Sequence, residues 1–166
     1  VIVGVHNNIS REISSSICIA VLVLLTAILL QVLSNFANDY GDSLTGLDNE
    51  KRIGPKRAVQ QGLISLKEMK IAIIISSVLA CITGISFILL SFGFSFNEMI
   101  VFFILGGLSI VAAITYTVGL IYGYKGLGDI SVFIFFGLVS VLGAEYVVSH
   151  MISTYSYLPG SLLFRI

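Results

Sequence analysis

The chain has 166 residues, of which 57% are hydrophobic and only 11% are charged, and its formal net charge is zero. A soluble globular domain carries about 25% charged residues, so this composition excludes that class. The zero net charge also leaves no basic field that would favour nucleic acid. Cys18 and Cys81 lie in apolar runs without the spacing of a disulfide framework or a CxxC metal site. The composition therefore predicts an integral membrane protein.

Long apolar runs divide the chain into candidate membrane spans. A bilayer core about 30 Å thick needs roughly 20 apolar residues in helical form. Unbroken runs of this length favour helices over barrel strands, which alternate over about ten residues. We therefore expect an all-α, polytopic transmembrane helical bundle with about four full spans and a partial span at each end. The full spans are expected at residues 13–37, 71–92, 99–119 and 130–148.

Both ends of the chain lie in apolar sequence. Residues 1–5 are expected to be the tail of an earlier helix, and residues 162–166 the start of a later one. The sequence has no initiator methionine. We therefore expect residues 1–166 to be a single transmembrane domain that is truncated at both ends.

Basic residues gather in two of the connections between spans. The turn at 93–98 carries Glu98 and no basic residue, whereas the connection at 39–70 carries six basic residues and the connection at 120–129 carries one. By the positive-inside rule, both basic connections are expected to face the cytoplasm. Residues 150–161 are expected to form a second outer loop. The basic residues of the two cytoplasmic connections are Lys51, Arg52, Lys56, Arg57, Lys67, Lys70 and Lys125.

Polar side chains follow the first span at helical spacing. Asn35, Asn38, Asp39 and Asp42 stand at positions i, i+3, i+4 and i+7. If the helix continues to Asp42, these four side chains share one face. Carboxylate and amide oxygens suit hard cations, and Mg²⁺ is usually held by one or two carboxylates together with substrate phosphates. The face therefore predicts a Mg²⁺ site at the end of the first span.

The basic residues that follow complement this acidic face. Arg52, Lys56 and Arg57 come next in the chain, and arginine binds phosphate through a planar fork of donors. Acidic residues that hold a metal, beside basic residues that hold phosphate oxygens, indicate a metal-bound diphosphate substrate. Spacing alone leaves open the alternative of a solvated cytoplasmic loop of mixed charge.

Two stretches of sequence resemble a known family. One is LSNFANDYGD at residues 33–42, followed by RIGP at 52–55 and QGLISLKEMK at 61–70. The other is LGGLSIVAAITYTVG at 105–119, followed by YGYKGLGDISV at 122–132. Together they resemble the UbiA superfamily of intramembrane prenyltransferases, and most closely the branch that prenylates 1,4-dihydroxy-2-naphthoate. The resemblance covers roughly residues 30–148.

The resemblance implies a metal site. The family's first Asp-rich motif, N-x-x-x-D, is matched by Asn38 and Asp42, and it binds Mg²⁺ with the prenyl diphosphate. Many members have another aspartate four residues later, where this chain has Gly46. Asp48, six residues after Asp42, is the spacing of the naphthoate branch. The implied metal ligands are Asn38, Asp42 and Asp48.

The resemblance also implies contacts with the substrate. The family's Tyr/Lys pair, which contacts the diphosphate, is matched by Tyr122 and Lys125, which with Asp42 form the expected catalytic set. Residues 119–122 depart from the family pattern, because they lack a basic residue and a proline and are one residue shorter. Asp129 either contacts substrate or caps the following helix. The expected substrate-binding residues are Asn35, Asp39, Arg52, Arg57 and Asp129.

The implied reaction is Mg²⁺-dependent transfer of a polyprenyl group from polyprenyl diphosphate to 1,4-dihydroxy-2-naphthoate. The ring loses its carboxylate, and the product is demethylmenaquinone, made at the bacterial cytoplasmic membrane in menaquinone synthesis. One alternative is another aromatic acceptor, such as 4-hydroxybenzoate. A transporter is a further alternative, but it predicts charges deep within several spans. The family's second Asp-rich motif does not appear before Ile166, so these residues alone are expected to be inactive.

Three other polar features carry smaller expectations. Glu145 is expected to reach the membrane interface or to pair with a neighbour. Tyr116 is expected to line the cavity. The small residues around Gly106 and Gly107 are expected to allow close helix packing.

Overall fold

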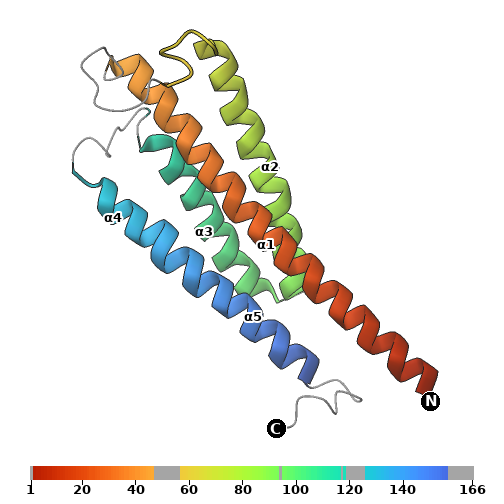
Figure 1. Ribbon diagram of the computed structural model, residues 1–166. Helices are drawn as coiled ribbons and strands as arrows, with labels where there is room; N and C mark the ends of the chain where they lie inside the picture. Colours follow the sequence, from red (N-terminus) through yellow and green to blue (C-terminus); the bar gives the residue numbers. More distant parts are fainter. Residues whose placement is uncertain (1, 47–56, 94, 117, 119–125, 157–166) are drawn as a thin grey trace.

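The computed structural model describes residues 2–46, 57–93, 95–116, 118 and 126–156, with side chains from residue 13 to residue 150. Within these ranges the fold is helical and contains no strand. The elements are α1 (Ile2–Thr45), α2 (Leu66–Phe92), α3 (Phe96–Thr115), α4 (Gly128–Val132), the π-helix η2 (Phe133–Val139) and α5 (Ser140–Ser156). The elements α4, η2 and α5 follow one another as a single rod (Figure 1).

Among the described residues, four helices are long and apolar enough to cross a membrane, which confirms the predicted number of full spans. Many large apolar side chains point outward from the bundle, as expected where lipid is the solvent. The backbone N–H and C=O groups of these helices are hydrogen-bonded within the helices themselves, as a lipid environment requires. The candidate spans are Ile13–Thr45, Leu66–Phe92, Phe96–Thr115 and Gly128–His150.

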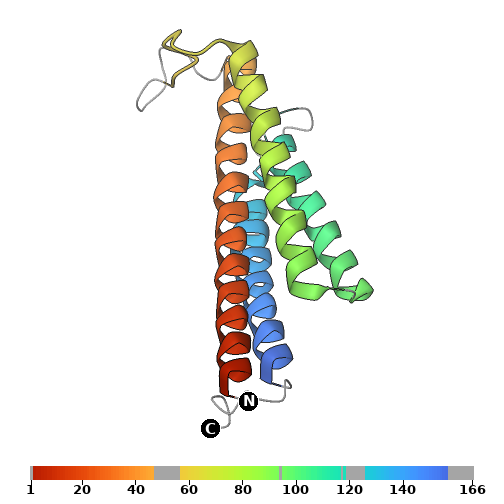
Figure 2. The same ribbon diagram turned by 90° about the vertical axis from the view of Figure 1, so that its right-hand side faces the viewer.

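The helices run up and down, so that the two long connections lie at one end of the bundle. The end of α1, the start of α2, the end of α3 and the start of α4 share this end, which we call the polar end (Figures 1 and 2). The short turn between α2 and α3 lies at the opposite, distal end. The sequence predicted that both connections share a side, and the arrangement of the helices confirms it.

Helices α1 and α2 pack closely near their middles. The Thr26 hydroxyl on α1 donates to Thr83 Oγ1 on α2 at 2.9 Å. A Cβ added at Gly84 would lie 3.6 Å from Thr26 Cγ2, so a small residue suits the approach of the two helices. Towards the distal end, a buried apolar cluster joins α1, α2 and α5. Its members are Ile19, Ile88, Phe92 and Val147.

The structure corrects the two ends of the predicted pattern. Helix α1 begins at Ile2 and runs without a break to Thr45, so the prediction that residues 1–5 end a separate earlier helix is wrong. Polar residues at 6–12 do not interrupt a helix that lacks proline, because the backbone hydrogen bonds can continue through them. Helix α5 extends to Ser156, so the prediction of an outer loop at 150–161 is wrong for residues 150–156, and its remaining residues lie outside the described ones.

Two internal helix boundaries also differ from the prediction. Helix α2 starts at Leu66 rather than at residue 71, because Ser65 and Glu68 form a capping box. The Ser65 backbone N–H donates to Glu68 Oε2 at 2.8 Å, and the Glu68 N–H donates to Ser65 Oγ at 3.2 Å. Helix α3 ends at Thr115, four residues before the predicted end of its span at residue 119.

Candidate functional site

The C-terminal end of α1 carries the predicted acidic face. The helix continues through Asp42 to Thr45 and ends at Gly46, whose φ of +71° places it in the left-handed region. Hydroxyls of the last turns bond back to the helix: the Ser43 hydroxyl donates to the Asp39 carbonyl at 2.8 Å. The helix therefore continues far enough to carry the four residues on neighbouring turns: Asn35, Asn38, Asp39 and Asp42.

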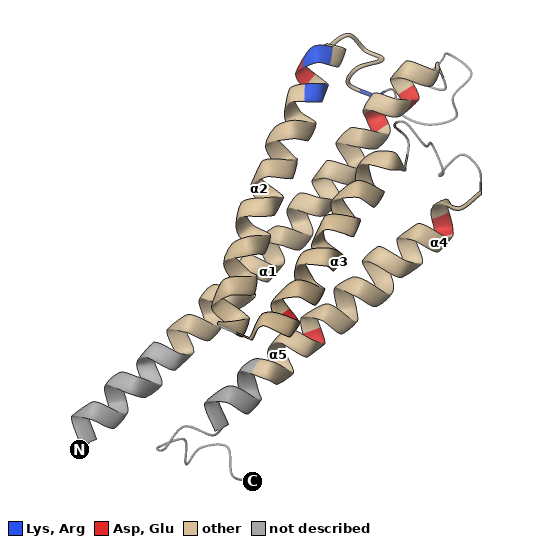
Figure 3. Cartoon of the chain, turned by 180° about the vertical axis from the view of Figure 1, so that it is seen from behind, with Lys and Arg blue, Asp and Glu red and all other residues tan. Residues whose placement is uncertain are grey.

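Arg57 contacts both carboxylates of this face, those of Asp39 and Asp42. Its Nη1 lies 2.6 Å from Asp39 Oδ1 and 2.7 Å from Asp42 Oδ2. Asp42 is 9% exposed, and the Arg57 side chain is 17% exposed. Figure 3 shows the acidic positions at the polar end of α1, with basic and acidic positions at the start of α2. The charges are thus concentrated at the polar end, and three of them meet at one point.

A cavity of about 370 Å³, which we call the polar cavity, lies between α1, α3 and the rod of α4 and η2, and Asn38, next to Asp39 in the chain, lines it. Amides and hydroxyls from all three sides line it, together with aromatic rings and aliphatic side chains, so that most of its wall is apolar. Its volume falls in the range of small-molecule sites. The polar lining residues are Gln31, Ser34, Asn35, Asn38, Ser109, Tyr116, Ser131 and Ser140. The aromatic rings are those of Phe135 and Phe136.

Tyr116 lies on the wall of the polar cavity, as predicted. It follows the last residue of α3 and packs against the start of α4. A Cβ added at Gly128 would lie 2.5 Å from the Tyr116 hydroxyl oxygen and 3.2 Å from two of its ring carbons. Gly128 is buried, so only a residue without a side chain leaves Tyr116 in this position.

A second, apolar cavity of about 300 Å³ adjoins the polar one. Side chains of α1, α2, α3 and the last rod line it. Ser109 and Phe135 belong to the walls of both cavities. Phe135 lies in the π-helix η2, and π-helical segments are often found at functional sites. Residues shared by the two cavities are Ala27, Leu30, Ser109, Phe135 and Ser140.

The structure distributes the predicted site residues over these features. Asn35 and Asn38 line the polar cavity, whereas Asp39 and Asp42 contact Arg57. Asp42 is therefore paired with Asp39 through Arg57, and the metal ligand expected beside it, Asn38, points into the cavity. The predicted residues Asp48, Arg52, Tyr122 and Lys125, with the neighbouring Lys56, lie outside the described residues.

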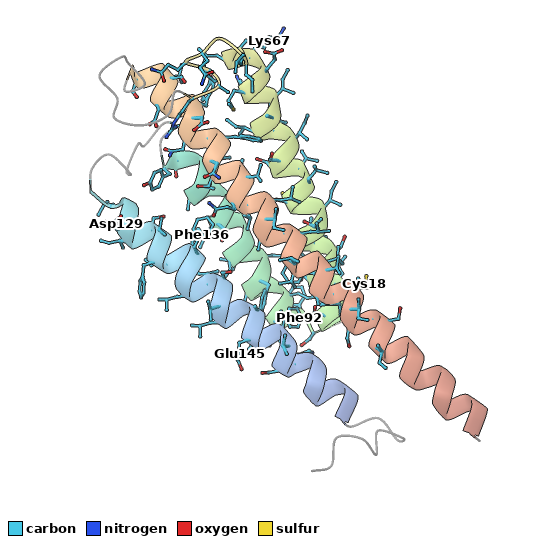
Figure 4. All side chains as sticks on the ribbon, in the orientation of Figure 1. Cys18, Lys67, Phe92, Asp129, Phe136 and Glu145 are labelled. Atoms are coloured by element: carbon cyan, nitrogen blue, oxygen red, sulfur yellow. The ribbon has the colours of Figure 1, made fainter. Side chains whose placement is uncertain are left out.

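Asp129 lies at the polar end of the last rod (Figure 4), in the first turn of α4, and is exposed. It is not the helix cap that the sequence allowed. Leu127 occupies the N-cap position, and no side chain caps the helix there. An aspartate in the first turn still interacts favourably with the positive end of a helix, although α4 itself is short.

Asp39 and Asp42 are the candidate metal donors among the described residues. The part of the chain that the structure describes contains no group of three or more His, Cys, Asp or Glu side chains that could hold a metal ion. Two carboxylates do converge on one point, however, and that point already carries a positive charge. Carboxylate oxygens suit Mg²⁺, which often takes only one or two of them from the protein. The donors present therefore fit a Mg²⁺ ion that is also held by phosphate.

Sequence reasoning missed two residues on α1. Gln31 and Ser34 line the polar cavity together with Asn35 and Asn38. Their positions continue the same i, i+3, i+4, i+7 series one turn towards the membrane centre. That spacing was visible in the sequence and was the signal that could have found them. Ser109 and Ser131, from the other walls, carry no such signal because their meeting depends on the tertiary fold.

Comparisons with known proteins agree with the arrangement. The chain is 51% identical over 144 residues to the 1,4-dihydroxy-2-naphthoate octaprenyltransferase of Escherichia coli strain K12, covering 86% of this chain and 46% of that protein. The enzyme of the same name from Haemophilus influenzae is 51% identical over 142 residues, with 85% and 46% covered. The one from Mycobacterium leprae is 37% identical over 128 residues, with 76% and 41% covered.

The chain thus spans a little under half the length of these relatives. No solved structure matches it significantly. The UbiA prenyltransferase family matches residues 9–164, nearly the whole chain. The chain therefore belongs to the UbiA prenyltransferase family and is an integral membrane protein.

Proposed function

We propose that the whole protein transfers a polyprenyl group from polyprenyl diphosphate to 1,4-dihydroxy-2-naphthoate. The C1–oxygen bond of the prenyl diphosphate breaks, a carbon–carbon bond forms at the ring, and the ring carboxylate leaves as CO₂. The products are diphosphate and demethylmenaquinone in its reduced, quinol form. The observation that carries this proposal is the meeting of Asp39, Asp42 and Arg57 beside a cavity lined by hydroxyls and aromatic rings. The names of the similar proteins supply the acceptor.

The charged group at the end of α1 is the proposed diphosphate site. Asp39 and Asp42 would hold a Mg²⁺ ion, and Arg57 would donate to phosphate oxygens through its planar fork. When bound, Mg²⁺ neutralises the charge that develops on the departing diphosphate. Because Asp42 is nearly buried, its charge is poorly screened by water and interacts strongly with a cation placed there.

The polar cavity is the proposed acceptor site. Its rings, Phe135 and Phe136, offer faces for a fused aromatic ring system, and Ser109, Ser131 and Tyr116 offer hydroxyl groups for the acceptor's own hydroxyls. The apolar cavity behind it would receive the first isoprene units of the donor. An allylic cation formed between the two would be shielded from water by these walls, which limits hydrolysis.

The proposal is tested with the whole protein in membranes. Labelled polyprenyl diphosphate is offered with 1,4-dihydroxy-2-naphthoate or with 4-hydroxybenzoate, in the presence and absence of Mg²⁺. We expect Mg²⁺-dependent prenylation of the naphthoate alone, with release of CO₂. Transfer to hydroxybenzoate instead would keep the site and change the acceptor. Transfer to neither, from folded protein, would reject prenyl transfer and return attention to transport.

We also propose that the polar end faces the cytoplasm. Lys67 and Lys70 lie at the start of α2, at the polar end, and are exposed. Basic residues next to a span favour the cytoplasmic side. A Lys67→Cys variant in intact cells should resist a membrane-impermeant thiol reagent and react after permeabilisation. Because Cys18 and Cys81 are also exposed in the structure, the control is the same protein without the introduced cysteine. Labelling of the introduced thiol in intact cells, above the level of this control, would reverse the orientation.

A further inference from the structure

The bridge made by Arg57 places one cationic nitrogen between two carboxylates. Nη1 is 2.6 Å from Asp39 Oδ1 and 2.7 Å from Asp42 Oδ2, which are ion-pair distances, although neither contact has the geometry of a hydrogen bond. Both oxygens are thus held within reach of a single point. Two carboxylates so close together repel each other unless a positive charge lies between them. Arg57 supplies that charge.

The surroundings make this bridge strong. The Arg57 and Asp42 side chains are 17% and 12% exposed, whereas the Asp39 side chain is 30% exposed, so water screens the charges of Arg57 and Asp42 poorly. Removing Arg57 takes away a positive charge that is held close to both carboxylates. A divalent cation that approaches Asp39 and Asp42 must therefore either replace Arg57 or share the carboxylates with it.

Hydrogen bonds hold the backbone of Arg57 in a turn. Its N–H donates to Gln60 Oε1 at 3.4 Å, and its carbonyl accepts from the Gln61 N–H at 3.0 Å. The turn that follows continues with the Leu63 N–H donating to the Ala58 carbonyl at 3.0 Å. The guanidinium reaches α1 at the end of a long, rotatable side chain from this anchored turn.

We propose that Arg57 holds the position of the metal before a divalent cation binds, and exchanges its carboxylate partners for diphosphate oxygens when the metal arrives. The inference rests on the proposed function, because it takes Asp39 and Asp42 as the metal-binding pair. Guanidinium binds phosphate oxygens as well as carboxylate oxygens, so the exchange replaces one set of charged contacts by another. Arg57 is then a competitor of the free metal and a partner of the metal-bound diphosphate.

If Arg57 has this dual role, its removal should change the affinities for free metal and for diphosphate in opposite directions. Without the competing guanidinium, free metal should bind more tightly. Without the phosphate partner, diphosphate should bind the metal-loaded protein more weakly. A residue that only kept the carboxylates in place would weaken both steps when it is removed. A residue with no connection to the site would change neither.

The experiment measures Mn²⁺ binding to the whole protein in detergent by electron paramagnetic resonance, first with Mn²⁺ alone and then with inorganic diphosphate. For Arg57→Gln we expect the Kd for Mn²⁺ to fall on the order of tenfold, because a nearby buried positive charge is lost. We expect the Kd for diphosphate at saturating Mn²⁺ to rise on the order of tenfold, because a charged hydrogen-bond partner is lost. Lys67→Gln removes an exposed charge at the same end of the bundle. It should change each of these two Kd values by much less than Arg57→Gln does.

Arg57→Lys decides the question if the glutamine variant does not fold. The shorter, single-point ammonium weakens the bridge without removing the charge, so Mn²⁺ should bind more tightly than to wild type, by a smaller factor. Unchanged or weaker Mn²⁺ binding in a folded Arg57 variant would overturn the inference. Failure of the proposed function would look different. In that case the wild-type protein would show no Mn²⁺ binding that depends on Asp42, and this result would overturn both the proposed function and the inference.

Discussion

The two ends of the bundle both place charged groups among helices, yet they use them differently. At the polar end, Asp39, Asp42 and Arg57 meet beside a polar cavity of about 370 Å³. At the distal end, Glu98 accepts from the Tyr146 hydroxyl at 3.4 Å and lies 3.9 Å from His150 Nδ1. Among the described residues, neither charged group lines either of the two cavities itself, but Asn38, next to Asp39 in the chain, lines the cavity of about 370 Å³.

The distal group is surrounded by aromatic rings. Phe92 lies 4.8 Å from Phe102 and 5.1 Å from His150, measured between ring centroids. Figure 4 places Phe92 and Glu145 towards this end, far from Lys67 and Asp129. Glu145 pairs with a neighbour, as predicted, since Ser149 donates to its Oε1 at 2.9 Å. Charges that adjoin a cavity-lining residue can meet a ligand, whereas charges packed among rings mainly join helices.

The largest expected difference between the ends concerns catalysis. Asp42→Asn in the whole protein should lower prenyl transfer on the order of 10²–10³-fold, the loss typical when one electrostatic stabiliser is removed. Glu98→Gln, at the distal end, should leave transfer near the wild-type rate. Turnover of labelled polyprenyl diphosphate, with expression and folding checked for both variants, makes the comparison. Equal losses would show that the two ends do not differ in function.

A smaller effect is expected from Gly128, through Tyr116. In Gly128→Ala the new Cβ would lie 2.5 Å from the Tyr116 hydroxyl oxygen, so the ring must move into or away from the polar cavity. Overpacking of this kind costs about 1–3 kcal/mol, and we expect kcat/KM for the naphthoate to fall on the order of tenfold. Gly137→Ala is the matched control, because its added Cβ would meet only Phe133, at an ordinary contact distance of 3.7 Å, and Gly137 lines neither cavity. Similar kinetics for both variants would remove Tyr116 from the acceptor site.

The distal contact should affect stability alone. His150→Gln removes the possibility of an ion pair with Glu98, and its free energy of unfolding should fall by no more than about 1 kcal/mol, as for other partly exposed pairs. Thermal unfolding in detergent measures the change, and the transfer assay should give an unchanged rate. A strong loss of activity without loss of folding would mean that the distal end takes part in the reaction.

The smallest expected effect tests the packing between α1 and α2. Thr26→Val removes the hydrogen bond to Thr83 and should cost about 0.6 kcal/mol, the average for such bonds between membrane helices. Thr115→Val is the control, because that hydroxyl donates within its own helix, to the Val111 carbonyl at 2.7 Å. Unfolding measured in bicelles should separate the two variants. If both cost the same, the bond between the helices contributes nothing specific.

The sequence predicted the spans well because each depends on local composition. An apolar run that is long enough to cross a bilayer has few alternatives to forming a helix. The start of α2 was missed although its signal was present, since Ser65 and Glu68 stand at the spacing of a capping box. The π-helix at Phe133–Val139 was not predicted, because its wider turns depend on packing against other helices rather than on a residue pattern.

The site was predicted in part for the same reason. Helical spacing brought Asn35, Asn38, Asp39 and Asp42 together, because they lie on one element. The bridge from Arg57 could not be read from spacing, since it depends on how the connection after α1 folds back. The roles of Asp48, Arg52, Tyr122 and Lys125 stay predictions, as does the Mg²⁺ requirement.

The most direct test of the central claim is equilibrium binding of labelled polyprenyl diphosphate to the whole protein, with Mg²⁺ and with Mg²⁺ chelated. Wild type and the distal variant Glu98→Gln should bind the donor tightly only with Mg²⁺, and Asp42→Asn should lose this dependence. That result would place the metal-bound diphosphate at the polar end. Equal, Mg²⁺-dependent binding by all three proteins would contradict it, because the donor would then be held without the carboxylate at the end of α1.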